Sequence, residues 1–67
     1  MDISGGDIRE AIEKKIQEEK PQTKEEILRI IDETIHELRT IGKIRSDADL
    51  YYWKNYFAQR WQQFLNQ

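Results

Sequence analysis

The sequence predicts an all-α fold, a small three-helix bundle, and three observations support this prediction. Apolar residues recur at intervals of three and four along the chain, which is the spacing of one face of an α-helix. Pro21 and Gly42 interrupt this pattern, and both residue types commonly follow the end of a helix. A residue type that favours the helix N-cap precedes each stretch. We therefore expect helices at residues 7–20, 23–41 and 47–66, within a single domain of 67 residues.

The first helix is expected to begin near Asp7. Glu10 follows three positions later, which matches a capping box, and Ser4 is the alternative cap. The helix would present one apolar face, made of Ile8, Ala11, Ile12 and Ile16. Residues 1–6 are expected to form a flexible N-terminus of the single helical domain 1–67.

The second helix is expected to lie between the other two. Thr23 is its predicted cap, with Glu26 at the capping-box position, and Gly42 is its predicted end. Its apolar residues span about 160° of a helical wheel, which is wider than the roughly 100° needed to contact one neighbour. They are Ile27, Leu28, Ile30, Ile31, Ile35, Leu38 and Ile41.

The third helix carries every aromatic residue of the chain, between Tyr51 and Phe64. Ser46 is its predicted cap, with Asp49 in the first turn. Six large side chains fall within about 120° of one another on a helical wheel. We expect this face to fill the groove between the two isoleucine-rich helices; it consists of Leu50, Trp53, Phe57, Trp61, Phe64 and Leu65.

Tyrosine and glutamine residues beside this face predict a contact surface. Tyr52, Tyr56, Gln59 and Gln63 fall within about 60° of one another on a continuous helix. Tyrosine combines a large contact area with a polar tip, which favours interfaces. In the alternative interpretation, the tyrosines only cover the edge of the core. The sequence thus favours a non-catalytic protein-interaction or assembly module, whose partner is another protein or a second copy.

A homodimer is narrowly favoured because the core available to 67 residues is small. The chain has no cysteine for a disulfide, so association is a common remedy for a domain of this size.

Residues suited to catalysis or metal binding are few. With no cysteine and a single histidine, a zinc site within one chain is nearly excluded. Glu33 and His36 match the Glu-x-x-His pattern of di-iron bundles, but on a helical wheel they face away from the apolar side. We therefore predict no catalytic residue, no cofactor, no metal and no enzymatic activity.

The charge of −2 is unevenly distributed. Residues 1–37 carry a net −5, whereas residues 38–67 carry a net +3. The favoured interpretation is that an acidic half complements a basic half inside the fold. The alternative is a small nucleic-acid-binding regulator that uses the basic residues Arg39, Lys43, Arg45, Lys54 and Arg60.

No apolar run approaches the roughly 18 residues of a membrane-spanning helix. The first ten residues also lack the basic start and apolar stretch of a signal peptide. The expectation is therefore a cytoplasmic location and no membrane partner.

Overall fold

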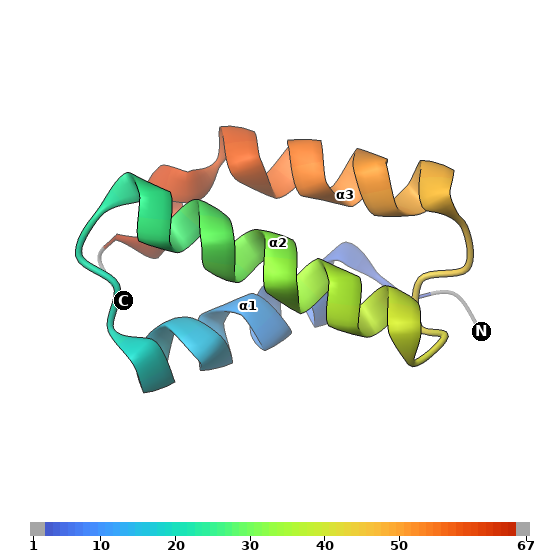
Figure 1. Cartoon of the computed structure of the whole chain (residues 1–67), viewed down its shortest axis with the longest axis horizontal. Coiled ribbons are helices and arrows are strands. Elements are labelled where there is room, and N and C mark those ends of the chain that lie inside the picture. The colour runs from blue at the N-terminus through green and yellow to red at the C-terminus, as the bar shows by residue number, and fades with distance from the viewer. Residues whose placement is uncertain (1–2, 66–67) are drawn as a thin grey trace.

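Three α-helices follow one another in the computed structural model, which describes residues 3–65 (Figure 1). The helix α1 spans Gly5–Glu19, α2 spans Lys24–Thr40 and α3 spans Asp47–Gln59, and a 3-10 turn, η1, spans Trp61–Phe64. In Figure 1, α2 lies between α1 and α3, and it packs against both of them and against η1. The predicted all-α, three-helix architecture is confirmed.

The start of α1 differs from the prediction. Ser4 is the N-cap: its Oγ accepts a hydrogen bond from the backbone N–H of Asp7 at 3.2 Å, and the Asp7 carboxylate accepts one from the Ser4 N–H at 3.5 Å. This reciprocal pair satisfies two backbone donors at once, so Asp7 stands third in the helix and is not its cap. Gly5 and Gly6, expected in a flexible N-terminus, form the first turn of α1. Residues 1–2 of that expected segment lie outside the described residues.

Both ends of α2 agree with the prediction. Thr23 Oγ1 accepts from the Glu26 N–H at 3.2 Å, and Glu26 Oε2 accepts from the Gln22 N–H at 3.2 Å. At the C-terminal end Gly42 has a φ of 85°, in the left-handed region. The Gly42 N–H donates to the Arg39 carbonyl, and the N–H of residue 43 donates to the carbonyl of residue 38, which together form a Schellman motif.

The predicted single helix over residues 47–66 is wrong beyond Gln59. Arg60 has φ −109° and ψ 23°, and its N–H bonds to the Phe57 carbonyl three residues back. The 3-10 turn η1 that follows the break still packs against α2. This turn directs Phe64 into the core, where it lines a hollow with Ile16. Residue 66 of the predicted helix lies outside the described residues.

The core consists of aliphatic residues from α1 and α2 closed by a few residues from α3 and η1. Of the predicted aromatic face, Leu50, Phe57 and Phe64 are buried, Trp53 and Trp61 are half-buried, and Leu65 is exposed. The break at Arg60 explains part of this difference, because residues after it no longer follow the helical wheel. The buried apolar residues are Ile8, Ile12, Ile16, Ile27, Ile30, Ile31, Ile35, Ile44, Leu50, Phe57 and Phe64.

Candidate interaction surface

A groove of about 480 Å³ lies between the first turns of α1 and the side of α3. We call it the aromatic groove. Gly5 sets its depth, since a Cβ there would lie 3.1 Å from Cη2 of Trp53, closer than most side chains permit. The absent side chain therefore allows the indole ring to lie directly over the helix backbone. The groove is lined by Gly5, Gly6, Arg9, Tyr52, Trp53, Tyr56, Phe57, Arg60 and Gln63.

The aromatic rings of this groove form a continuous cluster from the surface to the core. The Tyr52 and Trp53 ring centroids lie 4.9 Å apart with the rings nearly perpendicular, and those of Trp53 and Tyr56 lie 5.5 Å apart. Tyr56 contacts Phe57 edge to face at 5.0 Å, and Phe57 is buried. These are favoured aromatic geometries, so each ring restrains its neighbour. Tyr52, at the outer end of the cluster, is 58% exposed.

Arg60 extends the aromatic groove beyond the end of α3. Its guanidinium carbon lies 3.8 Å from the centroid of the Tyr56 ring, and Nη1 donates to the Tyr56 carbonyl at 3.0 Å. The stacking and the hydrogen bond together fix a planar cation beside an aromatic face. A second arginine, Arg9, lines the opposite wall, where its Nε lies 3.1 Å from Oε1 of Glu13. The groove thus combines aromatic faces with two guanidinium groups.

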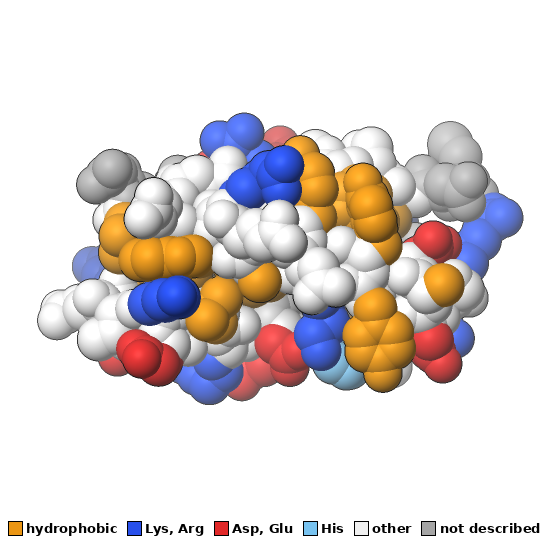
Figure 2. All heavy atoms as spheres, turned by 90° about the horizontal axis from the view of Figure 1, so that it is seen from above, with side chains coloured by type: hydrophobic (Ala, Val, Ile, Leu, Met, Phe, Trp, Pro, Cys, Tyr) orange, Lys and Arg blue, Asp and Glu red, His pale blue; other side chains and the backbone are white. Residues whose placement is uncertain are grey.

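The structure brings together three of the four residues predicted as partner contacts. Tyr52, Tyr56 and Gln63 line the aromatic groove, whereas the exposed Gln59 does not. The prediction assumed that one helix runs through all four positions, and the break at Arg60 changes the direction of Gln63. The wall formed by α1 was not predicted, although the Gly5-Gly6 pair was the available signal for a close approach to the backbone. Figure 2, which looks down on α3, shows aromatic and apolar side chains exposed along it with basic side chains between them.

Several basic residues of the nucleic-acid alternative interact within the chain. Arg39 Nε lies 3.4 Å from Oδ1 of Asp47. Lys54 forms an ion pair with Asp32 of α2 and lies over the Tyr51 ring, 5.7 Å from its centroid. Arg45 also has an interaction partner, and Lys43 is exposed in the turn after α2. The pair between Lys54 and Asp32 joins the basic half of the chain to the acidic half.

Glu33 and His36 lie on the exposed side of α2, as their wheel position predicts. Glu33 Oε1 accepts from Arg29 Nη1 at 3.0 Å, and His36 Nδ1 lies 3.0 Å from the Asp32 carbonyl oxygen. The hydrogen bond from Arg29 to Glu33, with a second to Glu19, raises the pKa of Arg29. Within residues 3–65, no three side chains of the metal-binding types converge on one point.

A scan against protein-family models and searches of curated proteins and of solved structures found no match to this chain. Over the described part of the chain, no helix has both the length and the apolar character needed to cross a membrane.

Proposed function

We propose that this chain is a non-catalytic protein-interaction module that holds a segment of a partner protein in the aromatic groove. One observation carries the proposal: Tyr52 is 58% exposed at the outer end of a ring cluster that continues into the core. A ring that its neighbours already restrain loses little conformational freedom when a partner binds. The entropy cost of fixing this side chain therefore offsets less of the binding energy.

The chemistry of the groove indicates what the partner segment carries. Tyrosine, tryptophan and arginine are the residues that dominate binding energy at protein interfaces. The stacked guanidinium of Arg60 is held beside Tyr56, and Arg9 lies on the opposite wall. A complementary segment would place an apolar side chain on the exposed ring of Tyr52 and a carboxylate beside the guanidinium group of Arg60.

A protein partner is favoured over nucleic acid because basic residues of the second half of the chain already interact with acidic residues of the same chain. Lys54 and Arg39 are paired with carboxylates of Asp32 and Asp47. A phosphate backbone would have to compete with these ion pairs and approach a chain of net negative charge. Nucleic-acid binding remains the second candidate, since Arg60 beside exposed tyrosine rings is an arrangement that stacks on unpaired bases.

The cytoplasmic location and the homodimer expected from the sequence are part of the same proposal. The cytoplasmic location is supported by a sequence without cysteine, and the homodimer by the small size of the core.

The proposal is tested by selecting peptides that bind the parent chain from a random library and measuring their affinity for variants. Tyr52→Ser removes the outer ring, and Arg60→Gln removes the stacked cation. Tyr51→Ser is the matched control, because Tyr51 is similarly exposed on the same helix but does not line the groove. We expect each groove variant to weaken binding by roughly tenfold or more, the loss typical of a central interface residue, while the control binds like the parent.

Peptides that bind all three variants equally would contradict the proposal. The nucleic-acid alternative is tested in parallel by fluorescence anisotropy with labelled single-stranded DNA. Binding that falls steeply with salt and is lost in Tyr52→Ser would replace the protein partner with nucleic acid.

A further inference from the structure

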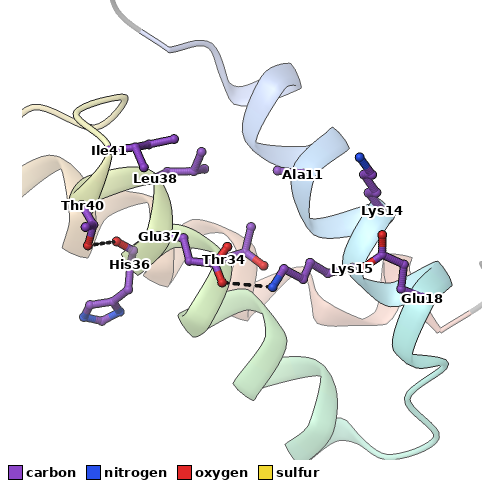
Figure 3. A pocket seen from close by; sticks show the side chains of 10 residues that line it. All are labelled: Ala11, Lys14, Lys15, Glu18, Thr34, His36, Glu37, Leu38, Thr40 and Ile41. Carbon is purple, nitrogen blue, oxygen red and sulfur yellow. Dashed lines mark hydrogen bonds and ion pairs between the residues drawn. The ribbon is translucent and has the colours of Figure 1, made fainter.

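A second groove, of about 580 Å³, lies between α1 and α2 (Figure 3). We call it the α1–α2 groove. On α1 its lining residues, Ala11, Lys14, Lys15 and Glu18, follow three- and four-residue spacing, so one stripe of that helix faces it. The wall formed by α2 consists of Thr34 and of residues between His36 and Ile41. Ala11 of this groove and Arg9 of the aromatic groove are two residues apart and thus point about 160° away from each other around α1. The two grooves therefore lie on different sides of the molecule.

One end of the α1–α2 groove is apolar and open. Figure 3 shows Leu38 and Ile41 extending from α2 toward the side of α1 that carries Ala11. Alanine is too small to reach across, which leaves the hollow between the helices. Ile41 is 66% exposed, the highest value among the large apolar side chains of residues 3–65. Deeper in the groove Thr34 is buried, and its hydroxyl has no hydrogen-bond partner.

The other end of the groove is spanned by an ion pair. Lys15 Nζ donates to Glu37 Oε1 at 3.0 Å and so connects α1 to α2 (Figure 3). This hydrogen bond, together with the negative charge of Glu37, raises the pKa of Lys15 above its ordinary value. The pair closes this end, so the accessible apolar surface is confined to the region of Ala11, Leu38 and Ile41.

The charges on α1 are arranged symmetrically about Ala11. Asp7 precedes it by four residues and Lys14 follows it by three, so all three share one face within about 60°. If a second α1 crossed antiparallel at Ala11, Asp7 of each copy would lie beside Lys14 of the other. Lys14 forms no ion pair with any residue between 3 and 65, which leaves it available for this contact. A surface that complements itself in this way is what a two-fold symmetric interface requires.

We propose that two copies of this chain associate through their α1–α2 grooves, about a two-fold axis beside Ala11. The helices α1 and α2 of both copies then form a four-helix arrangement, in which Ile41 of each copy covers the apolar end of the groove of the other. Alanine at the crossing point lets the helices approach closely, since side chains at the contact set the distance between packed helices. Covering Leu38 and Ile41 also adds apolar burial to a domain with a small core.

The interface rests on the homodimer of the proposed function and specifies where its two copies meet, but it does not involve the aromatic groove. The interface leaves the aromatic groove of each copy open, because it uses the other side of α1. A dimer of this kind would present two aromatic grooves at once and could bind a partner with two matching segments more tightly than a monomer does.

The proposal is tested by measuring the mass of the parent chain by light scattering at protein concentrations from about 1 µM to about 1 mM. This range covers the dissociation constants of weak to moderate dimers. We expect the measured mass to rise from the chain mass of 8.1 kDa toward twice that value. Ile41→Lys places a charge on the apolar end of the groove, and Lys14→Glu places like charges beside Asp7. Each should raise the dimer dissociation constant by roughly tenfold or more. Both positions are exposed, so circular dichroism should remain that of the parent.

Two control variants distinguish this interface from an interface on the aromatic groove and from a general effect of charge. Lys43→Glu makes the same charge change as Lys14→Glu at an exposed position outside the groove, and Tyr52→Ser alters the aromatic groove. Both are expected to dimerise like the parent. A mass of 8.1 kDa throughout the concentration range would overturn the proposal. So would a dimer that is weakened by Tyr52→Ser and unaffected by Ile41→Lys, because it would place the interface on the aromatic groove.

Discussion

Two adjacent glycines at the start of α1 have different surroundings, and the difference can be measured. A Cβ at Gly6 would find only Ser4 Oγ, at 3.7 Å, whereas one at Gly5 would lie 3.1 Å from the Trp53 ring. Gly6→Ala should therefore stabilise the chain by about 0.4–1 kcal/mol, the usual gain from reduced freedom of the unfolded state. Gly5→Ala should gain less or lose stability, because the indole must move. Urea unfolding followed by tryptophan fluorescence measures the free energy of unfolding of both variants. An equal increase in the two variants would show that the Trp53 ring does not restrict a side chain at residue 5.

Phe57 and Trp61 were expected on the same buried face, but the structure separates them. Phe57 is buried, whereas Trp61 is half-buried and has Lys24 Nζ 5.4 Å from its ring centroid. Phe57→Ala should lower the free energy of unfolding by about 3–5 kcal/mol. A chain of this size has a total of about 3–10 kcal/mol, so this variant should be largely unfolded by circular dichroism. Trp61→Ala should remain folded and lose less; a larger loss at Trp61 than at Phe57 would contradict this placement.

At the scale of the element, Gly42 shows the effect of backbone conformation alone. A Cβ there would meet nothing within 4 Å, yet the residue has a φ of 85°. Gly42→Ala should thus cost about 1–2 kcal/mol through the left-handed backbone, without any steric contact. Chemical denaturation measures this cost, with Gly6→Ala as the control at a residue whose φ is not positive. An unchanged unfolding free energy would show that the Schellman motif does not restrain the end of α2.

At the scale of the whole molecule, the central position of α2 predicts an order of stability among the helices. It packs against α1, α3 and η1, and its buried residues include Ile30, Ile31 and Ile35. Amides of these residues should exchange with solvent only through global unfolding, and amides of α1 should exchange through smaller openings. Native-state hydrogen exchange by NMR, at protein concentrations below and above dimer formation, measures both. Protection of α1 that increases with concentration would agree with the proposed α1–α2 interface. An α1 more protected than α2 at low concentration would contradict the predicted order.

The sequence by itself determined the number of helices and most of their ends. Thr23, Gly42 and Ser46 act on backbone groups within a few residues of themselves, so local chemistry is sufficient to place them. The isoleucine periodicity likewise determined most of the buried faces of α1 and α2, whereas Ile41, predicted on the apolar side of the second helix, is 66% exposed.

Only the tertiary structure decided where α3 ends and where the two grooves lie. The break at Arg60 lets η1 pack against α2 and bury Phe64, and these tertiary contacts are not contained in any local pattern of residues 47–66. The grooves exist because a small residue of α1 faces a particular part of its neighbour: Gly5 lies under Trp53, and Ala11 lies across from Leu38. Each hollow is a property of two segments packed together, so it forms only when residues distant in the sequence are brought side by side.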